Sequence, residues 1–271
     1  MVTAITEHPI GLLTNFTIPA LSEWEQMKID FNIKPLSDSG YIGSAIYLTC
    51  LGIISTIGNS LIIAMFLKEK KLRMKPHNLL LLNLAVSDLG ISIFGYPWTT
   101  ASCYAGRYLF GRVGCTIQGF TTFTLAQTDM NTLACLSFYR YINICKPHYN
   151  YKLTPLTTKW VISLIWVYSI VWTAPPLFGW SSYIPEPFGT SCSIDWTNGE
   201  LAPALYTWLL VIFCYLIHII TIVFCYYQIS VRAREVQKSL SNSVSHPLGT
   251  DEVRCFHRIA MEKKVTLVRS F

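Results

Sequence analysis

The chain has 271 residues, of which 52% are hydrophobic and 13% are charged, with a formal net charge of +6 at pH 7. Soluble domains carry about 25% charged residues, so this composition argues against a soluble protein. The uncharged residues also gather in long runs, which would leave too little polar surface to cover the core of a soluble fold.

The first 40 residues precede the first long apolar run and are expected to form an exposed, extracellular N-terminal tail. Glu7 and His8 stand where a signal peptide would have basic and then apolar residues, so no secretory signal is predicted. The tripeptide Asn-Phe-Thr at Asn15 is an acceptor sequence for N-glycosylation.

Five apolar runs follow, and each has the roughly 20 residues that a helix needs to cross a bilayer. They predict an all-α transmembrane bundle over residues 41–229, with spans at about 41–67, 78–99, 113–143, 160–180 and 203–229. Residues 230–271 are expected to form a cytoplasmic loop and the basic, amphipathic start of a sixth helix, with no room left to span.

Seventeen of the 21 lysines and arginines lie in the segments that follow the first, third and fifth runs. Such segments normally face the cytoplasm, so the N-terminus is expected outside a plasma membrane. The positive charge is then expected to face anionic membrane lipid, with no nucleic acid as a partner.

Three of the nine cysteines, Cys103, Cys115 and Cys192, are expected at the outer face, where disulfides persist. A bond between Cys115 and Cys192 would pull the loop before the fifth span over the mouth of the bundle. Cys103 competes for the same partner and is the less favoured of the two by spacing.

Several short motifs occur in a fixed order along the spans. They are "GNS" (58–60), "LNLAVSD" (82–88), a cysteine opening the third span, "YRYINICKP" (139–147), Trp166, and a cysteine before the fifth span. This order resembles the rhodopsin-like G-protein-coupled receptors. "APPLFGW" (174–180) is similar to opsins, and "YIPEPFGTSCSIDW" (183–196) is similar to their neuropsin branch. The resemblance covers about residues 40–268.

The resemblance implies a seven-helix, non-visual photoreceptor that carries retinal as a protonated Schiff base on a lysine of its last helix. It implies a β-hairpin lid in the second extracellular loop, closed by Cys115 and Cys192, and a heterotrimeric G protein as partner, with a receptor dimer possible. No lysine lies inside any of the five runs. The Schiff-base lysine is therefore expected to be absent, and the chain to be a truncated form.

A buried positive charge needs a negative partner. Vertebrate visual opsins have a glutamate three residues after the third-span cysteine, where this chain has the neutral Gln118. Glu186 in the lid is then the expected retinal counterion, with a solvated loop glutamate as the alternative. Gln118, Thr122 and Gln127 are the expected pocket residues. Thr122 replaces the aspartate of amine receptors, which argues against a diffusible amine ligand.

Acidic residues inside spans are functional by default. Asp88 is expected to form an interior polar network with Asn59, through water or sodium or by a direct hydrogen bond. Asp129 is expected to pair with Asn131 or with water, or to tune the pocket.

The third span ends in Tyr139, Arg140 and Tyr141, where the family has an acid before the arginine. Arg140 is expected to meet the G protein, and Tyr226 matches its active-state partner. Without the acid, the resting state is predicted to be leaky. His218 replaces the fifth-span proline, which is expected to remove a helix bulge.

The predicted function is that of a light-sensing G-protein-coupled receptor. The alternatives are a non-signalling fragment that modulates full-length receptors and a receptor for a diffusible ligand. The sequence has no His-Glu-x-x-His and no Gly-x-Ser-x-Gly motif, so neither an enzyme nor a metal site is predicted.

Overall fold

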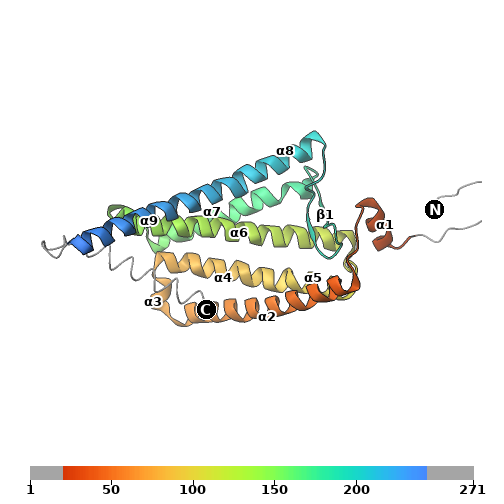
Figure 1. Cartoon of the computed structure of the whole chain (residues 1–271), viewed down its shortest axis with the longest axis horizontal. Coiled ribbons are helices and arrows are strands. Elements are labelled where there is room, and N and C mark those ends of the chain that lie inside the picture. Colours follow the sequence, from red (N-terminus) through yellow and green to blue (C-terminus); the bar gives the residue numbers. More distant parts are fainter. Residues whose placement is uncertain (1–20, 243–271) are drawn as a thin grey trace, which may run out of the picture.

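The computed structural model describes residues 21–242, with side chains described to residue 238. The predicted glycosylation site at Asn15 and the predicted start of a sixth helix lie outside these residues. Figure 1 shows long helices lying side by side, with a hairpin and a short N-terminal helix at one end of the bundle.

The helical elements are α1 (Glu23–Asp30), α2 (Asp38–Lys68), α3 (Lys70–Arg73), α4 (Pro76–Phe94), α5 (Tyr96–Tyr104), α6 (Gly111–Cys145), η1 (Pro147–Lys152), α7 (Pro155–Thr173), η2 (Pro175–Phe178), α8 (Leu201–Leu210), η3 (Val211–Leu216) and α9 (Ile217–Asn242). Strands β1 (Tyr183–Pro185) and β2 (Cys192–Ile194) form one antiparallel hairpin. The predicted class, helical with a hairpin lid, is confirmed.

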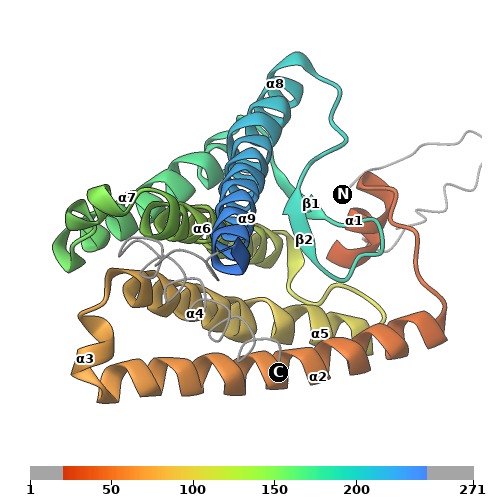
Figure 2. The same cartoon turned by 60° about the vertical axis from the view of Figure 1, so that its left-hand side comes forward.

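By length and composition, four helical stretches of the described chain could cross a membrane: Asp38–Lys68, Pro76–Tyr104, Pro155–Thr173 and Leu201–Lys238. Helix α6, predicted as the third span, is not among them because its buried faces carry polar side chains such as Thr128 and Thr132. Helices α4, α7 and α9 pack against α6, as Figure 2 shows. Its polar groups therefore meet protein instead of lipid.

The fourth helix ends earlier than the sequence predicted. Helix α7 stops at Thr173, and Pro175 and Pro176 then begin the 3-10 turn η2. Prolines lack the N–H that would continue the helical ladder, so the predicted end near residue 180 is wrong.

The fifth helix keeps its bulge without a proline, so the predicted loss of the bulge is wrong. Residues Val211–Leu216 are π-helical, immediately before His218. His218 Nε2 is hydrogen-bonded to Asn131 Oδ1 of α6, and the Tyr168 hydroxyl of α7 donates to the Phe213 carbonyl at 3.0 Å. A π turn displaces carbonyls from the normal ladder. Contacts from α6 and α7 therefore take the place of the proline.

The N-terminal segment is not a wholly exposed tail. Trp24 and Met27 of α1, and Phe31 directly after it, follow helical spacing and pack in one cluster with Tyr108 and the disulfide-bonded cysteines. The Met27 side chain is only 1% exposed. Because this apolar face needs covering, α1 lies over the end of the bundle that carries the hairpin.

Candidate functional site

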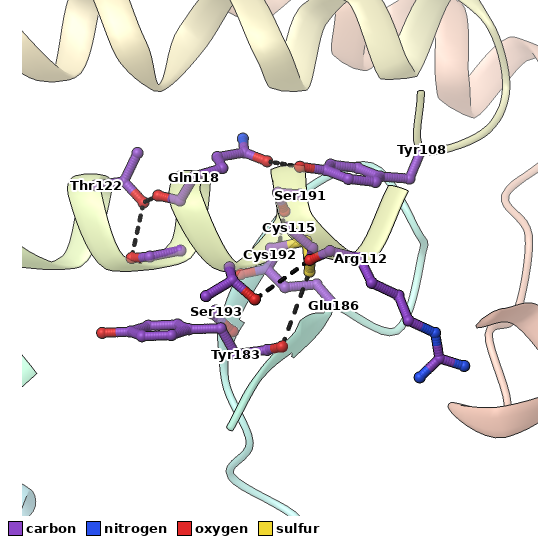
Figure 3. The surroundings of a disulfide bond; sticks show 12 residues. Tyr108, Arg112, Cys115, Gln118, Thr122, Tyr183, Glu186, Ser191, Cys192 and Ser193 are labelled. Carbon is purple, nitrogen blue, oxygen red and sulfur yellow. Dashed lines mark hydrogen bonds between the residues drawn. A yellow bond between two sulfur atoms is a disulfide. The ribbon is translucent and has the colours of Figure 1, made fainter. Parts of the chain in front are cut away.

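A disulfide fixes the hairpin over the N-terminal end of α6. Tyr183 pairs with Ile194, and Pro185 pairs with Cys192. Cys115, near the start of α6, is bonded to Cys192 of β2, with their Cα atoms 5.3 Å apart (Figure 3). The favoured cysteine pairing is confirmed, and Cys103 remains a free, buried thiol.

The hairpin lies close against α6 because Gly119 has no side chain. A Cβ atom added there would lie 2.5 Å from the Tyr183 ring, which is closer than contacting atoms approach. The Tyr183 hydroxyl donates a hydrogen bond to the Thr173 carbonyl at 2.7 Å. The strand β1 is thus anchored both to α6 and to the end of α7.

A cavity of about 530 Å³ lies beneath this lid. It is bounded by α2, α4, α5, α6 and the hairpin, and it falls in the size range of small-molecule pockets. Of the predicted pocket residues, Gln118 and Thr122 line it, but Gln127 does not. Gln127 follows Gln118 by nine positions, which places it about half a turn away on α6.

Gln118 is held by two neighbours and is 3% exposed. Its Oε1 accepts a hydrogen bond from the Tyr108 hydroxyl at 2.7 Å, and its Nε2 donates to Thr99 Oγ1 at 3.0 Å. Figure 3 shows Gln118 and Tyr108 joined in this way. Burial raises the pKa of Tyr108 well above its ordinary value, so Tyr108 stays protonated and remains a donor. The amide is fixed in place and carries no charge.

Glu186 lies at the start of the hairpin turn, half-buried in the cavity wall. Its carboxylate accepts a hydrogen bond from the Ser191 hydroxyl, and its backbone N–H donates to the Ser191 carbonyl at 2.9 Å. Among the described lining residues, Glu186 is the one with an acidic side chain, and none is a lysine. The cavity therefore has a single negative charge, oriented by the lid itself.

The opposite end of α6 carries Arg140, which is 8% exposed. Its Nη1 donates a hydrogen bond to the Tyr226 hydroxyl of α9 at 3.0 Å. The Tyr139 hydroxyl shares a hydrogen bond of 3.1 Å with Thr158 Oγ1 of α7, and the Tyr141 ring packs on α9. The predicted residues at this end are thus brought together, with Tyr139 turned away from the arginine.

Residues 58–267 match the family described as 7 transmembrane receptor (rhodopsin family). The chain belongs to this receptor family. Squid rhodopsin has the same fold, with a TM-score of 0.73 at 24% identity over 92% of this chain and 67% of the squid chain. The family consists of receptors, so the prediction that the protein is not an enzyme is confirmed.

Curated relatives of this receptor are opsins. It is 40% identical to "Rhodopsin, G0-coupled" of Mizuhopecten yessoensis over 190 residues, which are 70% of this chain and 47% of the relative. It is 37% identical to "Opsin-5" of Homo sapiens over 202 residues, which are 74% of this chain and 56% of the relative. The predicted resemblance to opsins, including the neuropsin branch, is confirmed. The chain spans about half the length of these relatives.

The interior of this opsin-family receptor contains polar side chains on α2, α4 and α6. Asn59 donates to the carbonyl and the hydroxyl of Ser55, at 3.0 and 3.2 Å. Ser55 lies four residues earlier on the same face of α2, within easy reach of the amide. Asp88 is hydrogen-bonded to Asp129 of α6, and its predicted network with Asn59 stays a prediction.

Asp129 does not pair with Asn131, because side chains two residues apart point to different sides of a helix. Its carboxyl group contacts Asp88 and accepts a hydrogen bond from the Ser87 hydroxyl. A hydrogen bond between two carboxyl groups requires a proton on one of them.

Sequence reasoning missed Tyr108 and Ser191, which hold Gln118 and Glu186. Ser191 stands next to the disulfide cysteine and opposite Glu186 across a tight turn, a spacing that could have suggested the contact. Tyr108 gave no such signal, because its approach to Gln118 depends on how the loop before α6 folds.

Proposed function

We propose that this receptor is a light-sensing, non-visual opsin that holds retinal in the cavity beneath the lid. The observation that carries the proposal is Glu186, the one acidic residue of the described cavity lining, in a site where Gln118 is neutral. Bound retinal would supply the light absorption and isomerisation. The volume of the cavity and its position under the lid fit such a group.

Each polar residue of the cavity has a distinct role in this proposal. Glu186 neutralises the positive charge of the bound group, which would otherwise be costly to bury. Ser191 holds the carboxylate in position. Gln118 keeps a polar but uncharged surface, because Tyr108 and Thr99 already occupy its amide.

The proposed output is activation of a heterotrimeric G protein at the end of the bundle that carries Arg140. This end also bears most of the basic residues, which supports a cytoplasmic position. The disulfide-tied lid lies at the other end, which supports an extracellular position for it in the plasma membrane.

The test uses the longest product of the gene, obtained by sequencing its transcripts past the codon for Phe271, expressed and regenerated with retinal. We expect a retinal-dependent absorption band that changes on illumination, together with light-stimulated nucleotide exchange by a G protein. Glu186→Gln should shift or abolish the band, because the bound cation loses its partner. Glu200→Gln, at an acid outside the cavity lining, should leave it unchanged. A full-length product without any retinal-dependent band would refute the proposal.

A further inference from the structure

The segment that runs from α1 into the start of α2, residues 22–41, is hydrogen-bonded to the turn of the hairpin. We call this segment the strap. The Lys34 backbone N–H donates to the Pro187 carbonyl at 2.8 Å. The Tyr41 hydroxyl donates to the Phe188 carbonyl at 3.1 Å. The strap therefore holds the turn between β1 and β2 directly, at two consecutive residues.

The strap also packs on the same turn through apolar side chains. A Cβ atom added to Gly189 would lie 2.5 Å from the Trp24 ring and 2.9 Å from Ile33, closer than contacting atoms approach. Gly189 has a φ of +63°, which suits glycine in a tight turn. The ring of Trp24 can lie flush against the turn because this residue has no side chain.

Charged groups tie the strap to the start of α6. The Glu23 carboxylate accepts a hydrogen bond from the Arg112 backbone N–H at 2.7 Å. The Asp30 carboxylate forms an ion pair with the Arg112 guanidinium, and the two side chains are 34% and 51% exposed. Exposed ion pairs contribute little stability, so these ties orient the strap without locking it.

The turn that the strap holds forms part of the cavity wall. Phe188 and Thr190 of the turn line the cavity, and so does Leu36 of the strap itself. Cys103 of α5 lies in the same wall, with a free thiol that is 2% exposed and hydrogen-bonded with Thr190. Movement of the turn away from the bundle would therefore uncover Cys103.

We propose that the strap is a releasable cover, which holds the hairpin turn down and closes the cavity against water-soluble molecules. Helix α1 has eight residues, and Met27 is the one that is fully buried. A helix of this length is not stable alone, so it forms only while it is packed on the bundle. Segments with few buried contacts open at a lower free energy than the whole protein unfolds. Release of the strap is thus a local event, and it does not depend on retinal.

The test measures how fast Cys103 reacts in the purified 271-residue chain, held in lipid nanodiscs without retinal. The probe is a charged methanethiosulfonate that does not cross lipid, and mass spectrometry of the peptide carrying Cys103 gives the rate. We expect slow labelling of the unmodified chain. Trp24→Ala removes the ring from Gly189 and should raise the rate at least about tenfold. Asp30→Asn breaks the ion pair with Arg112 and should raise it about two- to fivefold.

Ile29→Ala and Glu25→Gln are the matched controls, since both side chains are exposed on the same helix. Neither should change the labelling rate. Cys214 is fully buried between the helices and should stay unlabelled in every variant. Equal rates in Trp24→Ala and Ile29→Ala, or fast labelling of Cys103 in the unmodified chain, would overturn the proposal. Labelling of Cys214 together with Cys103 would indicate global unfolding and would overturn it as well.

Discussion

The Arg140 guanidinium and the Tyr226 hydroxyl are hydrogen-bonded at 3.0 Å, which joins the C-terminal part of α6 to α9. The residue directly before Arg140 is Tyr139, which is not acidic, and its hydroxyl is hydrogen-bonded to Thr158. The Tyr226 hydroxyl is thus one partner of the arginine, and it lies on a different helix. The predicted leakiness of the resting state depends on this contact and is tested below.

Tyr226→Phe removes the hydroxyl while keeping the ring. Hydrogen bonds to charged groups contribute about 1.5–3 kcal/mol, so we expect light-stimulated nucleotide exchange by the full-length receptor to fall about tenfold or more. Tyr227→Phe is the control, because the neighbouring Tyr227 side chain is 61% exposed. A loss of the same size in both variants would contradict a specific role for the Arg140 contact.

Tyr139→Glu restores an acid beside Arg140. The carboxylate would compete with Tyr226 for the guanidinium, so we expect the dark activity of the full-length receptor to fall several-fold. Tyr139→Gln has a similar size without the charge and should lower it less. A reporter assay in darkness provides the measurement. If the unmodified receptor shows no dark signal, the predicted leakiness is wrong.

Replacing Cys115 and Cys192 together by serine opens a loop of 77 residues. Disulfides of this kind contribute about 2–4 kcal/mol, so we expect a clearly lower thermal unfolding midpoint and a more accessible lid. Cys50→Ser, at an exposed free cysteine, should leave the midpoint nearly unchanged. Similar midpoints for the double variant and the control would show that the lid is held by packing alone.

His218→Ala removes the bond between α9 and Asn131 beside the π turn. Polar contacts between membrane helices contribute about 0.6 kcal/mol on average and up to about 1.7 kcal/mol, so a loss in this range is expected in the free energy of unfolding. Thr221→Val is the control, because the Thr221 hydroxyl bonds only to Ile217 of its own helix. A destabilisation no greater than that of the control would mean that other contacts maintain the bulge.

The helical class and the hairpin lid could be predicted because they depend on local composition and on ordered motifs. The partners of Asp88 and Asp129 could not, since they depend on how α4 and α6 are rotated about their axes. Gln127 was expected in the cavity wall because its side chain is polar. It does not line the cavity, because it lies on a different face of α6 from Gln118.

The prediction that the bulge before His218 would be lost was wrong for a different reason. A proline is one cause of such a bulge, and its absence predicted a regular helix. In the structure, Tyr168 of α7 hydrogen-bonds to Phe213 of η3, and Asn131 of α6 hydrogen-bonds to His218 of α9. Contacts between helices cannot be predicted from the sequence pattern of one helix.

The π turn η3 also sets the angular relation between the two halves of the last described helix. A π turn contains an extra residue, and each residue turns an α-helix by about 100°. Tyr206 packs beneath the lid on one side of this turn, and Tyr226 reaches Arg140 on the other. Deleting one residue within η3 would leave Tyr206 in place and swing Tyr226 by more than a quarter of a revolution, out of reach of the arginine. The bulge thus sets the rotation of α9 relative to α8, so that Tyr206 packs against the hairpin while Tyr226 reaches Arg140.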